Sequence, residues 1–312
     1  MEKKRIIFMG TPIFSAKVFE AIQQAGYLIV AVVSQPDKPV GRKRELKPTP
    51  LKEMALKYNV PVLQPIKLKE QYQEVLDYKP DLIITCAYGQ MVPEVLLEYP
   101  EYGCINIHAS ILPRLRGGAP IHKAIMYGEE ETGITIMKMA KKMDAGDIYR
   151  IERVAITEQE TMGTLHDKLI ECASKLILEC LPAILTKSAV FTPQEESAVT
   201  YAYNVSKDEE LIHWNRSYEE VDRHIRSLIP SPVGYSEIED IKYRFHKVRK
   251  WEEKTIAEDG TVLGLIDSGL AVAVDGKVLL IDEIQPAGKA VLKAKDFFNG
   301  SGKNLVGKKF TQ

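Results

Sequence analysis

Asn106 and His108 are residues whose types and spacing could do chemistry. They lie in the run 104–108, whose β-branched residues predict a strand. Because successive strand residues point to opposite faces, the amide of Asn106 and the imidazole of His108 share one face. Both groups can donate an N–H to an oxygen that becomes negative during a reaction. A histidine in a strand is also often a structural residue, so the pair by itself leaves both interpretations open.

Two polar loops accompany this strand. Residues 110–120 follow it directly and are rich in Gly, Pro and Arg. Ligands of open α/β sheets bind just beyond the carboxyl ends of strands, which is where the pair and this loop lie. The tetrad D-A-G-D at 144–147 is a tight loop in which Gly146 can take a positive φ. It is either a solvated turn or the source of a carboxylate, Asp144, that reaches His108.

The first half of the chain predicts an α/β domain. Residues 5–9 and 27–33 are expected to be strands, and 14–25 has helical apolar spacing between them. Such a βαβ unit implies a parallel sheet. The near-continuous apolar run 81–86 is typical of a central parallel strand. The first turn offers only Gly10 and no G-x-G-x-x-G, so no dinucleotide site is predicted.

The second half predicts a small β-barrel. Short strands at regular spacing, separated by glycines, are expected over 241–248, 261–266, 269–274 and 278–284. We therefore expect an α/β protein in which a Rossmann-like parallel sheet domain is followed by a smaller, OB-like β-barrel domain. The predicted boundaries are 1–188 for the first domain, 189–205 for a linker, and 206–312 for the second domain.

The charge pattern limits where a nucleic acid could bind. The net charge is −1, so any such partner must meet local basic patches. Residues 34–50 carry five Lys and Arg against Asp37 and Glu45, and their four prolines predict no regular structure. This segment is either a solvated loop or a basic arm that contacts phosphates. Residues 241–250 and 289–309 are also basic, which is either a solvated face or a nucleic-acid face.

Other features exclude several classes of protein. The four cysteines form no C-x-x-C pair, which predicts reduced thiols of a cytosolic protein and no disulfide framework or zinc site. The first residues predict no signal peptide, and no apolar run in the given sequence is of membrane-spanning length. We expect a cytoplasmic monomer without membrane contact.

Several motifs together resemble the folate-dependent formyltransferase family. N-I-H at 106–108 is followed by S-I-L-P-R-L-R-G-G-A-P-I at 110–121, and F-M-G-T-P-I-F opens the chain at 8–14. M-D-A-G-D at 143–147 is similar to the element that holds the family's catalytic aspartate, and 284–300 is similar to its C-terminal domain. The resemblance thus covers nearly the whole chain.

The resemblance implies a specific reaction and a set of residues. It implies transfer of the formyl group of 10-formyltetrahydrofolate to the α-amine of methionine on initiator tRNA, without a metal ion. Asn106, His108 and Asp144 would be catalytic, with Asp144 favouring a charged imidazole and accepting a proton from the amine. The folate would be held by Ser110, Ile111, Leu112, Pro113, Tyr88 and Val92. The tRNA would be contacted by Arg42, Lys43, Arg44, Lys242, Arg244 and Lys247.

Three alternatives stay open. The chain could formylate a small molecule such as a nucleotide sugar or glycinamide ribonucleotide. It could be a folate hydrolase of the same fold. It could also be an RNA-binding protein with an inert Rossmann domain, although the intact Asn106, His108 and Asp144 argue against this.

Overall fold

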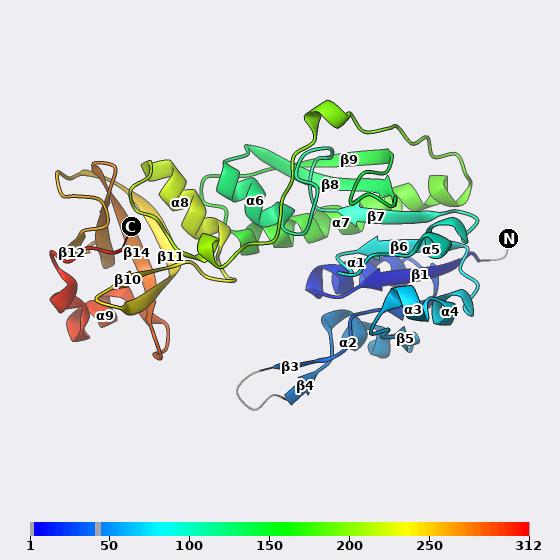
Figure 1. The fold of residues 1–312 in the computed structure, drawn as a ribbon, viewed down its shortest axis with the longest axis horizontal. Coiled ribbons are helices and arrows are strands. Elements are labelled where there is room, and N and C mark those ends of the chain that lie inside the picture. The colour runs from blue at the N-terminus through cyan, green and yellow to red at the C-terminus, as the bar shows by residue number, and fades with distance from the viewer. Residues whose placement is uncertain (1–2, 41–44, 312) are drawn as a thin grey trace. The chain divides into compact units, whose positions relative to one another are not determined.

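The computed structural model describes residues 3–40 and 45–311, and the chain divides into two compact units (Figure 1). Unit 1 comprises Met1–Gly117, Thr132–Val154 and His166–Tyr201, and unit 2 comprises Gly118–Glu131, Ala155–Leu165 and Ala202–Gln312. The units interleave along the chain, because residues 118–131 and 155–165 belong to unit 2 although segments of unit 1 precede and follow each of them. The domain boundaries at 188 and 206 therefore stay a prediction about where the chain passes from one fold to the other.

Unit 1 is built on a seven-stranded sheet in the order β5-β2-β1-β6-β7-β8-β9. Its strands are β1 (Arg5–Gly10), β2 (Leu28–Val33), β5 (Val62–Leu63), β6 (Leu82–Cys86), β7 (Cys104–His108), β8 (Glu131–Lys138) and β9 (Ile148–Ala155). The pairs from β5 to β7 are parallel, whereas β8 joins β7 antiparallel. The apolar run of β6 is buried along its whole length, as expected for a central parallel strand. The predicted Rossmann-like, mainly parallel sheet is confirmed.

Helices lie between these strands or follow the last of them, and the helix predicted over 14–25 from its apolar spacing is present. They are α1 (Ile13–Gln24), α2 (Pro50–Lys57), α3 (Leu68–Gln71), α4 (Gln73–Leu76), α5 (Glu94–Glu98) and α7 (Met162–Leu185). The turn between β1 and α1 requires glycine, since a Cβ on Gly10 would lie 2.4 Å from the Cβ of Ser15. This close approach lets the Ser15 hydroxyl donate to the Cys86 carbonyl at 2.5 Å, which ties α1 to the end of β6.

The basic segment 34–50 corrects one expectation. It contains a two-stranded antiparallel ladder of β3 (Lys38–Val40) and β4 (Glu45–Lys47), so the prediction of no regular structure was wrong. Pro39 is tolerated because both strands of a two-stranded ladder are edge strands. An edge strand leaves half of its N–H groups without a partner strand, so a proline can occupy such a position. Figure 1 shows this hairpin extending away from the sheet of unit 1. The predicted tRNA residues Arg42, Lys43 and Arg44 lie outside the described residues.

Unit 2 is built on an antiparallel sheet in the order β10-β11-β14-β13-β12, with β15 paired to β14. The strands are β10 (Tyr235–Ile238), β11 (Ile241–Lys254), β12 (Val262–Ile266), β13 (Gly269–Val274), β14 (Lys277–Pro286) and β15 (Leu292–Lys293). The C-terminal segment links the two end strands. The Val262 N–H, on β12, donates to the Lys308 carbonyl at 2.9 Å, and the Thr311 N–H donates to Glu237, on β10, at 2.8 Å. The predicted small β-barrel is confirmed.

Aromatic side chains fill the core of unit 2. Trp214 stacks on Phe310, with ring centroids 5.3 Å apart, and meets Phe245 edge-on at 5.5 Å. Phe310 thus anchors the closing segment to the core. Helices α6 (Pro120–Tyr127), α8 (Tyr218–Ser227) and α9 (Ala294–Gly300) complete the unit, and α8 begins at a capping box of Ser217 and Glu220.

The four cysteines are free in this structure. None of the helices in residues 3–40 and 45–311 is long and apolar enough to cross a membrane. Within the same residues, no three His, Cys, Asp or Glu side chains gather in a metal-binding group.

Candidate active site

Asn106 lies near the end of β7 and its amide orientation is set by the neighbouring strand. Thr85 is the residue opposite it on β6, and the Thr85 hydroxyl donates to Asn106 Oδ1 at 2.9 Å. With its oxygen held there, the amide presents Nδ2 to Asp144 Oδ1 at 3.4 Å. The Asn106 N–H group therefore faces the carboxylate that the sequence predicted beside it.

His108 is buried at the end of the same strand and is held by a backbone carbonyl. Its Nε2 lies 3.1 Å from the Leu115 oxygen, and because a carbonyl only accepts, Nε2 carries the proton of this bond. The other ring nitrogen, Nδ1, faces Asp144 Oδ2 at 3.7 Å. The loop that supplies the Leu115 carbonyl is fixed by Thr200, whose hydroxyl accepts the Leu115 N–H at 2.9 Å.

Asp144 sits in a tight loop between β8 and β9, with a left-handed φ of 49°. Its Oδ2 accepts the Gly117 N–H at 2.9 Å, so the loop after β7 also helps to place this carboxylate. The turn requires glycine at 146, where a Cβ would lie 2.0 Å from the Lys138 carbonyl oxygen. The structure thus brings Asn106, His108 and Asp144 together, and their catalytic roles remain predictions.

Sequence reasoning missed three residues that hold this cluster. Thr85 lies in a run that was interpreted only as an apolar strand, and its partner follows from the β6–β7 register. Gly117 was predicted only as part of a loop. Gln194, in the predicted linker, donates from Nε2 to the Asp144 and Gly146 carbonyls, a contact across about fifty residues for which no local pattern exists.

The predicted folate residues fall into two groups. Residues 110–113 form an ordered turn, in which the Thr135 hydroxyl donates to the Ser110 carbonyl at 2.6 Å and accepts the Leu112 N–H at 3.2 Å. Ile111 and Pro113 are half-buried beside them.

Tyr88 and Val92 belong to the buried apolar core of unit 1. The Tyr88 hydroxyl is buried without a hydrogen-bond partner among the described residues, and burial raises its pKa well above the ordinary value. A polar atom left in this way is available to a bound molecule. Folate binding by these residues remains a prediction.

The predicted tRNA residues of unit 2 lie along β11. Lys242 Nζ stands 3.4 Å from the ring centroid of Tyr235, and Lys247 lies opposite Glu283 on β14. The Arg244 Nε is buried without a hydrogen-bond partner within the part of the chain that the structure describes. The three cations therefore lie on one strand, and the Glu283 carboxylate lies on the neighbouring strand opposite one of them, Lys247.

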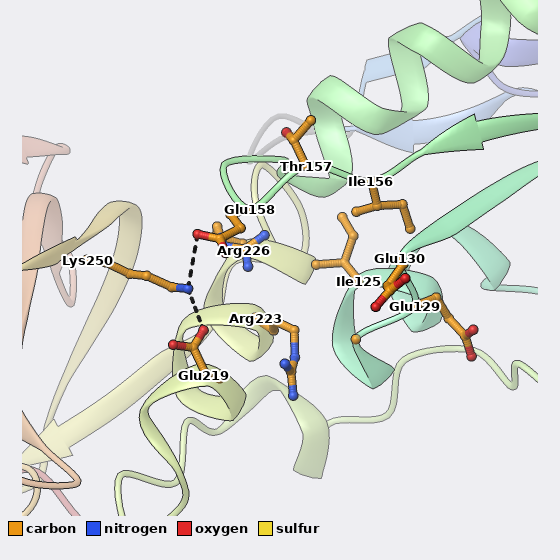
Figure 2. Close-up of a pocket in the computed structure, with 11 residues that line it drawn as sticks. Ile125, Glu129, Glu130, Ile156, Thr157, Glu158, Glu219, Arg223, Arg226 and Lys250 are labelled. Atoms are coloured by element: carbon orange, nitrogen blue, oxygen red, sulfur yellow. Dashed lines mark hydrogen bonds and ion pairs between the residues drawn. The ribbon is translucent and has the colours of Figure 1, made fainter.

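Unit 2 also contains a pocket of about 150 Å³ (Figure 2). It is lined by Ile125, Gly128, Glu129, Glu130, Ile156, Thr157, Glu158, Glu219, Arg223, Arg226 and Lys250. Lys250 pairs with Glu219 and with Glu158 at 3.6 Å, and Arg226 pairs with Asp222 at 2.8 Å. Because carboxylates match these cations, the pocket does not favour an anionic ligand. Of the predicted site residues that the structure describes, none lines this pocket.

Comparisons with known proteins cover both halves of the chain. Residues 4–181 match a family model described as formyl transferase, and residues 204–302 match one described as formyl transferase, C-terminal domain. A methionyl-tRNA formyltransferase of Geobacillus sp. (strain WCH70) is 46% identical over 97% of this chain and 96% of its own length. The methionyl-tRNA formyltransferase of Bacillus subtilis (strain 168) is 46% identical over 95% of each chain.

Solved structures share the fold at low sequence identity. HypX from Aquifex aeolicus, in complex with tetrahydrofolic acid, has a TM-score of 0.70 at 17% identity, over 96% of this chain and 48% of that one. WlaRD, a sugar 3N-formyl transferase, has a TM-score of 0.66 at 18% identity, over 93% and 100%. Since the family models match most of the chain and relatives align with it almost end to end, this protein belongs to the formyl transferase family.

Proposed function

We propose that the chain transfers the formyl group of 10-formyltetrahydrofolate to the α-amine of methionine carried by initiator tRNA. The observation that carries the proposal is the meeting of Asn106, His108 and Asp144 at the end of β7. It occurs in a chain that aligns almost end to end with methionyl-tRNA formyltransferases. We expect the enzyme to work in the cytoplasm as a monomer.

The three side chains suit this chemistry. The amine attacks the formyl carbon, a C–N bond forms, and the carbonyl oxygen becomes negative before the bond to N10 breaks. Asn106 Nδ2 and His108 Nδ1 both face the Asp144 carboxylate. In the proposed reaction, Nδ2 and a protonated Nδ1 donate to the negative oxygen of the bound substrate. Asp144 is the nearby base that can accept the proton lost by the amine, while N10 gains one.

The arrangement also gives each group one task. The Leu115 carbonyl occupies His108 Nε2, so Nδ1 is the nitrogen left for the reaction. The Thr85 hydroxyl occupies Asn106 Oδ1, so Nδ2, which lies 3.4 Å from Asp144 Oδ1, is the amide group left to donate to substrate. Donors that are already held in place need little reorganisation when charge develops.

A direct assay tests the proposal. The purified protein is mixed with 10-formyltetrahydrofolate and methionine-charged initiator tRNA, and the product is hydrolysed and analysed for formyl-methionine. Free methionine, uncharged tRNA and a nucleotide amino sugar are offered in parallel reactions. We expect formyl-methionine only from the charged tRNA.

The parallel reactions separate the alternatives. Formylation of the amino sugar alone would assign the chain to the small-molecule formyltransferases. Release of formate without any acceptor would indicate a folate hydrolase. Binding of tRNA with no consumption of the folate would indicate an RNA-binding protein without this activity.

A further inference from the structure

Gln194 makes four hydrogen bonds that join the two loops of the candidate active site. Its Nε2 donates to the Asp144 carbonyl at 2.8 Å and to the Gly146 carbonyl at 2.7 Å. Its Oε1 accepts from Arg116 Nε at 3.0 Å and from Arg116 Nη2 at 2.7 Å. The amide thus uses its donor side on the loop that carries Asp144 and its acceptor side on the loop that follows β7.

The surrounding residues make this junction stiff. The Arg116 side chain is fully buried, and it also donates to Glu196 at 2.9 Å. Glu196 pairs in turn with Lys142 at 2.9 Å, two residues before Asp144. The hydrogen bonds from Lys142 and Arg116 hold the pKa of Glu196 below its usual value, so it stays charged near neutrality.

A third link comes from the backbone next to Arg116. The Gly117 N–H donates to Asp144 Oδ2, and the Arg116 N–H donates to the Thr200 carbonyl at 2.9 Å. The segment that holds Gln194, Glu196 and Thr200 is therefore fastened to both loops. All of these residues belong to unit 1.

We propose that Gln194 is a positioning residue for the reaction, which holds the Asp144 carboxylate in place opposite Asn106 and His108. This inference rests on the proposed formyl transfer. Asp144 has a left-handed φ, which costs conformational free energy. Such a backbone conformation persists only where surrounding contacts hold it. Two hydrogen bonds to the carbonyls of residues 144 and 146 supply that restraint.

The chemistry of the side chain explains why an amide is needed there. Three of its neighbours are fixed: two carbonyl oxygens that only accept, and one guanidinium that only donates. Glutamine has one group of each kind. A glutamate could still accept from Arg116 but would bring a negative oxygen against the two carbonyls. A methionine keeps the length and volume and loses all four bonds.

The test uses these two substitutions in the full chain. Gln194→Met and Gln194→Glu are compared with Glu195→Gln at the neighbouring, exposed position. The Glu195 side chain accepts a hydrogen bond from the Ser197 hydroxyl and makes none of the bonds described above for Gln194. We expect both Gln194 variants to lower kcat roughly 10–100-fold, the effect of a misplaced reacting group. KM for the charged tRNA and the Kd for folate should stay within about twofold, because binding is not altered. Glu195→Gln should keep wild-type kcat.

A double-mutant cycle separates positioning from general destabilisation. If Gln194 acts through Asp144, Gln194→Met should cost nothing further in an Asp144→Ala background measured under single-turnover conditions. If the two losses multiply, or if Gln194→Met alone keeps kcat within about twofold of wild type, the inference is overturned.

Hydrogen exchange gives a readout that does not need turnover. Amides of residues 142–147 should exchange faster in Gln194→Met than in wild type, with the rest of unit 1 unchanged. A wild-type protein that makes no formyl-methionine refutes the proposed function, and in that case the exchange result alone decides whether Gln194 restrains this loop. Equal exchange in both proteins rejects the inference, whatever the activity.

Discussion

Leu115 takes no part in the proposed chemistry, yet its carbonyl decides which nitrogen of His108 faces the reaction. Because Nε2–H is used to donate to this carbonyl, Nδ1 is directed to Asp144. The gap of 3.7 Å between Nδ1 and Asp144 Oδ2 is longer than a hydrogen bond. A substrate oxygen can therefore approach Nδ1 without first displacing a strong hydrogen bond to Asp144.

The three clustered side chains should each matter for turnover. We expect Asn106→Ala, His108→Ala and Asp144→Ala each to lower kcat by roughly 10²–10⁴, since each removes a donor or a base from the transition state. Steady-state kinetics with charged tRNA measures the loss, and thermal unfolding checks that each variant is folded. Near-normal turnover by folded His108→Ala would refute its assignment.

At the scale of residues, the local part of the site could be predicted from the sequence. Asn106 and His108 could be paired from strand alternation alone, because the period of two is a local property. The family resemblance supplied Asp144. Gln194 could not be found in either way, because its partners lie across the fold and its own surroundings in the chain are an irregular, polar stretch.

At the scale of elements, the turn between β8 and β9 is closely packed against the end of β8. Replacing Gly146 with alanine would place a Cβ 2.0 Å from the Lys138 carbonyl oxygen, which is backbone and cannot swing away. We expect Gly146→Ala to destabilise the protein by about 1–3 kcal/mol and to lower kcat as strongly as Asp144→Ala. Denaturant unfolding and kinetics measure both effects.

Gly300 provides the matched control. It ends α9, and apart from its chain neighbours and its own helix backbone no described atom lies within 4 Å of a Cβ built there. Gly300→Ala should leave stability and kcat near wild type. A Gly146→Ala protein that behaves like Gly300→Ala would mean that the turn adjusts freely and does not fix Asp144.

Helix α8 makes stability depend on pH through His224. This side chain is buried, its ring donates to the Glu209 carbonyl at 2.7 Å, and burial lowers its pKa. The unfolded chain then binds more protons than the native one as the pH falls below the ordinary histidine value of about 6.5. The stabilisation that comes from keeping His224 neutral is therefore fully present above that pH. It is lost as the pH falls through the lower pKa that His224 has in the folded protein.

The contribution of His224 can be isolated by comparison. We expect the Tm of wild type to fall more steeply between pH 7.5 and pH 5 than the Tm of His224→Gln, in which a neutral amide replaces the imidazole. The neighbouring Asp222, whose pKa burial raises, acts in the opposite sense but is common to both proteins. Parallel curves for the two proteins would show that His224 does not titrate differently in the folded state.

The elements themselves show where sequence patterns are sufficient. Buried apolar runs predicted β1, β2 and β6, and the regular spacing of short strands predicted β11 to β14, because each pattern is local. The antiparallel direction of β8 depends on how the chain returns to the sheet, and no pattern in the residues of β8 predicts it. The β3–β4 hairpin was missed because its prolines were taken to exclude strands, which holds for central strands but not for a free ribbon.

At the scale of the whole molecule, a chain with a net charge of −1 must bind a polyanion through local patches. In the β3–β4 hairpin, Lys38 lies directly opposite Lys47, and neither forms an ion pair with another described residue. Like charges in such a pair repel each other, so a bound phosphate would relieve an existing cost. On β11, by contrast, Lys247 already faces Glu283. The hairpin is therefore the stronger candidate for tRNA contact.

The hairpin should govern the use of tRNA and leave folate binding alone. We expect Arg42→Ala, Lys43→Ala and Lys47→Ala each to raise KM for charged tRNA, because each removes a cation from the segment that we propose meets phosphates. Each lost contact should also reduce the slope of log affinity against log salt by roughly 0.9. The Kd for folate should not change, since the predicted folate residues lie at the ends of β6 and β7.

The measurement is steady-state kinetics with tRNA varied at several salt concentrations, together with folate binding followed by fluorescence. Lys57→Ala removes an exposed cation from the last turn of α2 and serves as the matched control, with tRNA KM and salt slope expected at wild-type values. If Arg42→Ala and Lys47→Ala match Lys57→Ala, the hairpin is only a solvated connection. The same series on Lys242, Arg244 and Lys247 would then locate the tRNA face on β11, because those cations lie together along one strand.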